Sequence, residues 1–488
     1  MDEIPPPSLH LERTTIGGNT SIPRIISGLW QLAGGHDEQV NIDEAAGTME
    51  LLVKAGFDCF DMADHYGVAE LVVGKFRASS PNDMLAFTKW CPPENGIKSF
   101  EAAEQAVMLS GERMKQRQIT LMQCRFLPPH IHSGNDASVL SFDHIWNYAD
   151  DTYWHNLMHL RVMQKRGNIK HIGVTNVDAA HLELLIDSGF DIATNQVSCS
   201  VLDQRLVRGR LASVCVKHKV GVLAYGTLLG GFLSEKWLDQ PEPEDMNSLN
   251  WSLRKYLRFI RAAGGWEPFQ GLLRALSAIA QKHNVSIPAV ATRYVLDIPI
   301  VSAVIVGCRL SAESYKYATR NLEAFSFALS EDDYVLIRKA QQALSDIPGD
   351  CGDEYRRPPY LTAAGDLSHH LKDSQDKAAE RSYNRREEDR VLYGESMGAD
   401  CRLLPADVSI PVLGGSSARS QTVAILDIIA HAIKALGGTL SDVVRTRVIV
   451  RNEQDCEEIS RLVGAEYLVE IEAEACLGFN EVFRLSLP

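Results

Sequence analysis

Apolar and polar positions alternate along residues 24–325 in a way that predicts short buried strands separated by amphipathic helices. Eight runs are short, apolar and rich in β-branched or aromatic residues, as the strands of a buried parallel sheet are. They are residues 25–30, 57–63, 85–90, 120–124, 171–176, 194–199, 221–227 and 301–307. Longer stretches with helical spacing lie between most of them, for example 42–55, 100–115, 179–188 and 269–282.

This alternation predicts an α/β fold. Eight strands with intervening helices over about 300 residues fit a closed (β/α)₈ barrel. A doubly wound open sheet produces the same alternation, and periodicity alone does not separate the two. No G-x-G-x-x-G follows the first predicted strand, which disfavours the classical dinucleotide-binding form of the open sheet.

The pattern changes after the predicted barrel. Residues 366–390 are rich in charged residues, Ser and Gln and hold almost no large apolar side chains, which indicates a solvated helix or a linker. Beyond it, residues 421–436 and 457–463 have helical spacing, whereas 444–448 and 468–473 alternate as strands do. We therefore predict an N-terminal segment (1–23), a barrel (24–365), a charged linker (366–397) and a smaller α+β domain (398–488).

Composition narrows the possible partners and compartments. The 488 residues include 49 Lys and Arg against 63 Asp and Glu, and the net charge of −14 argues against a nucleic-acid or anionic membrane partner. Ten cysteines without a C-x-x-C pair indicate a reducing compartment and no metal site. The N-terminus lacks the pattern of a secretory signal, and residues 423–436 are too short and too polar to span a bilayer. We expect a cytoplasmic protein.

The stretch Phe-Asp-Met-Ala-Asp-His-Tyr-Gly at residues 60–67 carries the clearest candidate chemistry. It follows an apolar strand, so Asp61 and Tyr66 would lie at a strand's carboxyl end, where barrel enzymes hold their catalytic groups. A tyrosine is a poor acid at neutral pH unless a cation stabilises its phenolate, and Lys89 at the end of the next strand is a candidate for that cation. Asp61 could pair with Lys89. Each residue taken alone could equally be structural.

Several dispersed motifs occur together in one order. They are Asp61-x4-Tyr66, Lys89, Gly-Val-Thr-Asn at 173–176, Asn-Gln at 195–196 and Ala-Tyr-Gly at 224–226. In this order, and at these strand ends, the chain from about residue 27 to 321 resembles the aldo-keto reductase family. The resemblance implies a (β/α)₈ TIM barrel that reduces aldehydes and ketones with NADPH, without metal or flavin. It also implies that Tyr66 is the general acid, that Lys89 lowers the pKa of Tyr66, and that Asp61 orients Lys89.

The catalytic histidine of the family would directly follow residues 121–124, but residue 125 is an arginine. Residues 142–150 resemble the His-x-Trp-x-Tyr-x-Asp run that accompanies the family histidine. Residues 124–143 are then an insertion, and His144 is the expected donor that orients the substrate. The alternative is a surface-loop histidine without a catalytic role.

The resemblance further implies a set of cofactor-binding residues. Thr175, Asn176 and Gln196 would bind the nicotinamide carboxamide, and Tyr225 would stack on the ring. The turn at 226–231 would approach the pyrophosphate, and Arg309 would bind the 2′-phosphate. The full expected set is Trp30, Thr175, Asn176, Gln196, Tyr225, Gly226, Thr227, Leu228, Gly230, Arg309 and Asn321.

The C-terminal segment is similar to a second family. Residues 435–448 and 469–475 resemble the Rid (reactive-intermediate deaminase) family, whose members are trimers that hydrolyse reactive imines. The strand that carries that family's substrate-binding arginine is missing between residues 464 and 470. We therefore expect a truncated Rid-like domain without deaminase activity, through which the chain could form homo-oligomers.

Our leading interpretation is an NADPH-dependent reductase in which Tyr66 gives a proton to a small-molecule aldehyde or ketone. The alternative is a catalytically weak nicotinamide-binding regulatory or scaffold protein with a degenerate Rid domain, which the displaced His144 favours. A bifunctional reductase–deaminase would need the missing arginine strand. The sequence does not identify the carbonyl substrate, and the polar cluster at 350–357 has no assigned role.

Overall fold

The computed structural model describes residues 11–33, 40–91, 98–124, 152–311, 313–356, 443–447, 471–476 and 482–487. The chain divides into two compact units. One comprises residues 1–127, 156–179 and 191–370, and the other comprises residues 128–155, 180–190 and 371–488. All the barrel strands belong to the first unit, and the three strands described near the C-terminus belong to the second.

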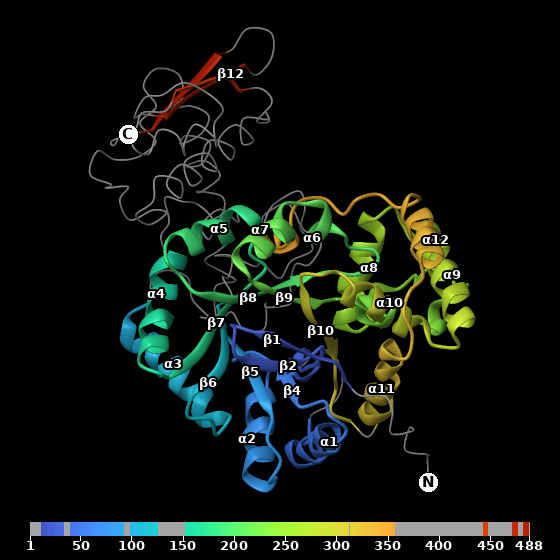
Figure 1. Ribbon diagram of the computed structural model, residues 1–488, viewed down its shortest axis with the longest axis horizontal. Helices are drawn as coiled ribbons and strands as arrows, with labels where there is room; N and C mark the ends of the chain where they lie inside the picture. The colour runs from blue at the N-terminus through green and yellow to red at the C-terminus, as the bar shows by residue number, and fades with distance from the viewer. Residues whose placement is uncertain are drawn as a thin grey trace. The chain divides into compact units, whose positions relative to one another are not determined.

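Eight parallel strands form a closed barrel in the order β10-β3-β4-β5-β6-β7-β8-β9 (Figure 1). Their bounds are β3 Ile25–Gly28, β4 Cys59–Asp61, β5 Leu85–Trp90, β6 Ile119–Cys124, β7 Ile169–Thr175, β8 Ile192–Ser198, β9 Gly221–Tyr225 and β10 Val301–Gly307. The barrel closes where Val304 lies opposite Ile25 and Gly307 lies opposite Gly28. The closed form of the predicted α/β fold is confirmed, and the open-sheet alternative is wrong.

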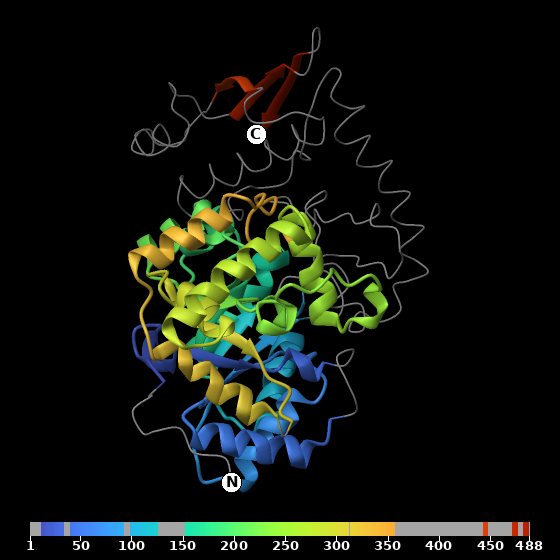
Figure 2. The ribbon, with the colours of Figure 1, turned by 90° about the vertical axis from the view of Figure 1, so that its right-hand side faces the viewer.

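Helices follow most of the strands along the chain, and helices of the first unit surround the strands in Figures 1 and 2. The longer described helices of the whole chain are α1 Ile42–Lys54, α2 Ala69–Ser79, α3 Phe100–Arg113, α4 Thr152–Lys165, α5 Ala179–Asp187, α7 Leu211–His218, α8 Trp251–Ala262, α9 Trp266–His283, α10 Ile287–Leu296, α11 Ser314–Asn321 and α12 Glu331–Gln341. Nearly all of α5 belongs to the second unit. Short helical turns are η1 Trp30–Leu32, α6 Arg205–Arg208, η2 Leu229–Gly231, η3 Glu235–Trp237, η4 Met246–Ser248, η5 Leu322–Phe325 and α13 Asp353–Arg356.

Local capping explains where several helices begin and end. The Asn41 side chain accepts hydrogen bonds from the first turn of α1, and Ser330 forms a capping box with Asp333 at the start of α12. Helix α9 ends at His283, and the capping residue Asn284 has the left-handed φ, 54°, that is typical of a helix C-terminus. The helices predicted at 42–55, 100–115, 179–188 and 269–282 all occur, the last beginning three residues earlier than predicted.

A hairpin precedes the barrel, in a segment to which the sequence pattern assigned no strand. Strands β1 (Arg13–Ile16) and β2 (Thr20–Pro23) pair antiparallel. Ile16 and Ile22 are buried in a cluster with Phe87 and other residues of the barrel interior. Gly17, with φ of 52°, lies so close to the start of β7 that a Cβ would stand 2.3 Å from the His171 ring. The hairpin therefore fills the end of the barrel at which the strands begin.

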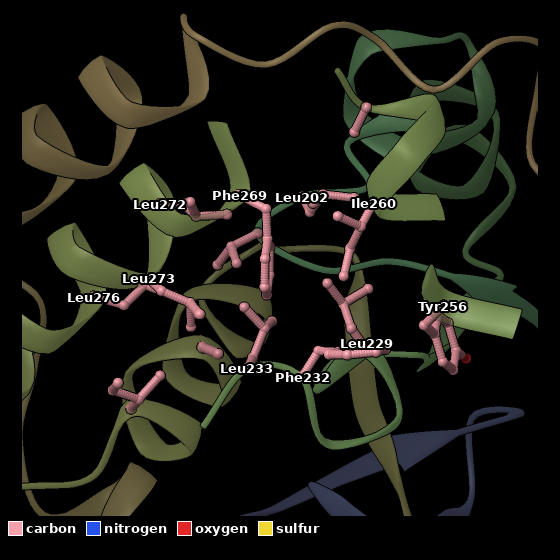
Figure 3. Close-up of a cluster of buried hydrophobic side chains, with 14 of the residues drawn as sticks. Leu202, Leu229, Phe232, Leu233, Tyr256, Ile260, Phe269, Leu272, Leu273 and Leu276 are labelled. Atoms are coloured by element: carbon pink, nitrogen blue, oxygen red, sulfur yellow. The ribbon is translucent and has the colours of Figure 1, made fainter. Parts of the chain in front are cut away.

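A second apolar cluster holds the long segment between β9 and β10. Side chains of α8 and α9 pack with the turn after β9, as Figure 3 shows for Leu229, Phe232, Leu233, Tyr256, Ile260 and Phe269. Leu257 and Phe259 are fully buried in the same cluster. Burial of these side chains anchors the turn at 226–231, which borders the site described below.

The second unit contains a sheet with the order β11-β12-β13 (Val443–Arg447, Ile471–Cys476, Val482–Leu487). Both pairs are antiparallel, and their register places Arg445 and Arg484 opposite Glu474. The strand predicted at 444–448 occurs, the one predicted at 468–473 lies at 471–476, and β13 was not predicted. The helices predicted at 421–436 and 457–463 fall outside the described residues, and the Rid resemblance stays a prediction. None of the described helices has the length and apolar character that a membrane span requires.

Candidate active site

The carboxyl ends of the barrel strands surround a cleft of about 1080 Å³. Asp61 ends β4, Lys89 lies in β5, Thr175 ends β7 and Tyr225 ends β9, and all four side chains line this cleft. Parallel strands of a closed barrel bring their carboxyl ends together, so residues far apart in the sequence meet here.

A buried ion pair lies at the bottom of the site. The Lys89 ammonium is 2.6 Å from Asp61 Oδ2, and the side chains are only 1% and 4% exposed. Lys89 also donates a hydrogen bond of 2.8 Å to the Met62 carbonyl. Asp61 is paired with Phe87 in the sheet register, and Lys89 comes two residues later on the same face of β5. Strand register alone therefore places this cation beside this carboxylate.

Tyr66 lies against the ammonium of Lys89. Its side chain is buried, and the Lys89 Nζ is 5.1 Å from the ring centroid. The next residue is Gly67, with φ of 55°, where a Cβ would stand 2.4 Å from the Leu32 carbonyl oxygen. Only glycine fits this position, and the close approach fixes the loop that carries Tyr66. The structure thus brings Asp61, Tyr66 and Lys89 together, as a proton-transfer site requires.

Two glutamine amides complete the surroundings of Asp61. Gln123 Nε2 and Gln196 Nε2 each donate a hydrogen bond of 2.8 Å to Asp61 Oδ1. Gln196 Nε2 also donates to Gln123 Oε1 at 2.9 Å. Both N–H groups of Gln196 are therefore used within the site, and its Oε1 is the atom that could accept a hydrogen bond from a carboxamide N–H. Sequence reasoning missed Gln123, one of two polar residues, with Thr120, in an otherwise apolar strand.

The predicted fourth catalytic residue is not placed by the structure. His144 and the greater part of the proposed insertion at 124–143 lie outside the described residues. Cys124, the last residue of β6, is buried. The position of His144 relative to Tyr66 stays a prediction.

All the predicted cofactor-binding residues line the same cleft as the ion pair. They are Trp30, Thr175, Asn176, Gln196, Tyr225, Gly226, Thr227, Leu228, Gly230, Arg309 and Asn321. Their positions run from the bottom of the barrel mouth, over the turn after β9, to the loop and helix that follow β10. These residues come from several different strands and loops, so the cleft could contact an extended nucleotide at several points.

Asn176 and Tyr225 are fixed to each other. The Tyr225 hydroxyl donates a hydrogen bond of 2.7 Å to Asn176 Oδ1, and Asn176 has a left-handed φ of 59°. Because the phenol supplies the proton, the atom of Asn176 that faces it is the acceptor oxygen, which directs the amide nitrogen away. Burial, together with Tyr355 and Glu354, raises the pKa of Tyr225 well above its usual value, so this phenol keeps its proton.

Comparison with known proteins identifies the family. Residues 24–342 match the Aldo/keto reductase family, which is well over half of the chain. The chain belongs to the aldo/keto reductase family. Its fold is also that of a glycerol dehydrogenase from Gluconobacter oxydans, at a TM-score of 0.52 and 20% identity over 69% of this chain and 97% of that one.

Relatives of this aldo/keto reductase include two proteins named as reductases. The chloroplastic pyridoxal reductase of Arabidopsis thaliana and the NADH-specific methylglyoxal reductase of Escherichia coli K12 are each 23% identical over 66% of this chain, covering 84% and 96% of their own lengths. Flagellar radial spoke protein 5 of Chlamydomonas reinhardtii is 35% identical over 134 residues, which span 26% of this chain and 24% of that protein. We therefore class the chain as an oxidoreductase that acts on aldehydes or ketones.

This aldo/keto reductase also has a cation in the cleft that sequence reasoning missed. The Lys255 ammonium, on α8, lies 4.9–5.3 Å from the centroids of four aromatic rings, those of Trp30, Tyr225, Tyr256 and Tyr355. It also donates a hydrogen bond to the Tyr355 hydroxyl. Aromatic faces attract cations, so the rings hold this side chain in the lining of the cleft. No spacing in the sequence relates Lys255 to Trp30 or to Tyr355.

Within the described residues, no group of three or more His, Cys, Asp or Glu side chains is arranged to hold a metal ion.

Proposed function

We propose that the chain reduces an aldehyde or ketone with hydride from NADPH. The observation that carries the proposal is the buried Asp61–Lys89 pair against Tyr66, at the bottom of a cleft lined by all the expected cofactor-binding residues. A proton donor, a cation that stabilises its conjugate base and a nucleotide-sized cleft are the parts that carbonyl reduction needs.

The residues of the site fit a bound nicotinamide nucleotide. Gly226 and Gly230 both have left-handed φ values, and a Cβ on Gly226 would stand 2.7 Å from the Tyr256 hydroxyl, so this turn exposes backbone where a side chain has no room. Thr175, Asn176 and Gln196 would hold the carboxamide, and the guanidinium of Arg309 would bind a 2′-phosphate. When bound, the reduced nicotinamide supplies the hydride.

The protein's own part in the reaction is the movement of one proton. Tyr66 gives its phenolic proton to the oxygen of the substrate carbonyl as negative charge develops there. The Lys89 ammonium stabilises the phenolate that Tyr66 becomes, and Asp61 holds the ammonium in place. The amides of Gln123 and Gln196 hold Asp61 in turn, so the charged groups are oriented before the substrate arrives.

Steady-state oxidation of NADPH with a generic aldehyde tests this function. We expect turnover by the wild-type chain and a preference for NADPH over NADH, the opposite of what its name states for the NADH-specific relative. Equal affinity for the two nucleotides in a fluorescence titration would reject the assignment of Arg309. Failure to bind either nucleotide would reject the function as a whole.

A second candidate is a nicotinamide-binding protein with little or no turnover. The similarity to a flagellar radial spoke protein favours it, as does the arginine that stands at residue 125 where the family histidine is expected. This candidate predicts that the chain binds NADPH but does not oxidise it with any of a panel of aldehydes. The same two measurements, binding and turnover, therefore separate the candidates.

A further inference from the structure

The polar cluster at residues 350–357, which the sequence left without a role, contains a tight turn with buried charges. It lies beyond the residues that match the family, and its described part ends with the short helix α13. Asp353 and Glu354 are 2% and 0% exposed. The backbone N–H of Asp350 donates to Asp353 Oδ2, and that of Gly352 donates to Glu354 Oε2, both at 2.7 Å. Burying a carboxylate costs folding free energy unless the charge is paired, so these two carboxylates need partners.

Arg205 ties this turn to the barrel. Its Nη1 donates to Glu354 Oε2 at 2.6 Å and to the Asp350 carbonyl at 3.0 Å. Its Nη2 and Nε bind Asp203 at 2.7 and 2.9 Å. Burial opposes the charge on Arg205, but Asp203 and Glu354 more than offset it and raise its pKa. Such a pair holds Glu354 in one position, because a guanidinium fixes the direction of the carboxylate it binds.

The other oxygen of Glu354 reaches the cofactor side of the barrel. Glu354 Oε1 lies 3.3 Å from the Tyr225 hydroxyl and accepts a longer share of the one phenolic proton that Asn176 Oδ1 accepts at 2.7 Å. The Tyr355 hydroxyl lies 3.4 Å from the Tyr225 hydroxyl. The same Tyr225 hydroxyl binds Asn176. One chain of contacts therefore runs from Arg205 through Glu354 to the two residues expected to contact the nicotinamide.

We propose that Glu354 is a positioning residue of the cofactor site, which holds the Tyr225 hydroxyl and, through it, the amide of Asn176. The proposal rests on the proposed function, because it concerns the ring on which the nicotinamide would stack. Tyr225 is anchored through its backbone in β9 at one end and through its hydroxyl at the other. Without Glu354 the hydroxyl keeps its bond to Asn176, but the two residues can move together to orientations that do not match the cofactor, which weakens binding without touching the proton donor.

Glu354→Gln tests the proposal. It keeps the shape of the side chain and removes the charge that Arg205 binds. We expect NADPH to bind about tenfold more weakly, or about 1.4 kcal/mol, in a fluorescence titration. We expect kcat at saturating NADPH to change less than about twofold, since Tyr66 and Lys89 are untouched. Glu354→Asp, which keeps the charge but shortens the reach toward Tyr225, should fold if Glu354→Gln does not and should show the same loss.

A double-mutant cycle separates this role from a structural one. Tyr225→Phe keeps the ring but removes the hydroxyl, so Glu354→Gln should weaken NADPH binding little further in that background. A merely structural effect would be equal in both backgrounds and would overturn the proposal. Asp353→Asn is the matched control in the same turn. It should lower the melting temperature and leave the NADPH affinity within about twofold of wild type.

The outcomes separate the proposed function from the positioning role of Glu354. If wild type binds neither NADPH nor NADH, the proposed function fails and this inference fails with it. If wild type binds NADPH and both Glu354 variants bind it equally well, only the inference is overturned. If Asp353→Asn weakens binding as much as Glu354→Gln, the turn acts through its overall stability, and the positioning role of Glu354 is wrong.

Discussion

Removing the hydroxyl of Tyr66 tests the proposed mechanism most directly. Tyr66→Phe keeps the buried ring beside Lys89 and deletes only the acidic proton. General acid catalysis typically contributes about 10²–10⁴-fold, so kcat should fall by that factor. The affinity for NADPH should barely change, because the residues expected to contact the nucleotide, such as Tyr225 and Arg309, are untouched.

The contribution of Lys89 follows from its distance to the ring. Lys89 Nζ lies 5.1 Å from the Tyr66 ring centroid. A separation of about 5 Å between the ammonium and the phenolate oxygen would give an attraction of about 3 kcal/mol at an effective dielectric constant of about 20. If the transition state has this attraction and the ground state lacks it, loss of Lys89 slows the reaction by about two orders of magnitude. Lys89→Met alone would leave Asp61 charged and buried without its partner, so it is combined with Asp61→Asn.

The assay is the loss of NADPH absorbance at saturating aldehyde and saturating NADPH. It compares wild type, Tyr66→Phe, Asp61→Asn/Lys89→Met and the triple variant. Both changes act on one proton, so the triple variant should be little slower than Tyr66→Phe alone. The reasoning would be refuted if Tyr66→Phe kept more than about half of the wild-type rate, or if the two losses multiplied in the triple variant.

Four further predictions concern the cofactor, stability and the C-terminal segment. Arg309→Ala should weaken NADPH binding about tenfold and leave NADH binding unchanged, and an equal loss for both nucleotides in a titration would contradict the 2′-phosphate role. Burial and then Lys170 lower the pKa of His171, so its contribution to folding stability is present above its unfolded value of about 6.5 and is lost as the pH falls. Urea unfolding at two pH values, one above and one below about 6.5, should show this loss of stability in wild type and a smaller loss in His171→Gln. Gly67→Ala should lower both the melting temperature and kcat, since its Cβ would stand 2.4 Å from the Leu32 carbonyl; an unchanged melting curve would contradict this. The full chain should not accelerate hydrolysis of 2-aminoacrylate-type imines, and robust turnover in a coupled assay would show that the Rid-like segment is not truncated as we expect.

Much of the barrel could be predicted from the sequence because its strands are buried on both faces. Such strands are continuous apolar runs, and the predicted runs at 85–90 and 301–307 coincide with β5 and β10. The hairpin β1–β2 was not predicted because each of its strands is only four residues long. The strands are only partly buried, so Ile16 and Ile22 stand among polar residues. Short mixed strands give too few positions to establish a period.

The candidate site divides in the same way between local and distant contacts. Asp61 and Tyr66 could be recognised because they lie five residues apart after one strand, and Lys89 follows on the neighbouring strand. Gln123 and Glu354 could not be recognised, because their contacts cross 62 residues to Asp61 and 129 residues to Tyr225. Closure of the barrel brings Gln123 to Asp61, and the ion pair with Arg205 brings Glu354 to Tyr225. The pattern of residues along the chain reveals neither contact.

The hairpin at the start of the chain has a kinetic consequence. Ile16 and Ile22 fill the barrel from the end at which the strands begin, and the cleft lies at the opposite end. A molecule that binds beside Asp61 and Lys89 must therefore enter and leave through the cleft. A second molecule that binds in the cleft uses the same opening. Under the proposed function, whichever reactant lies deeper has to come first and go last. Product-inhibition patterns would then show a compulsory order of binding. The reactant that lies deeper would compete only with the product formed from it.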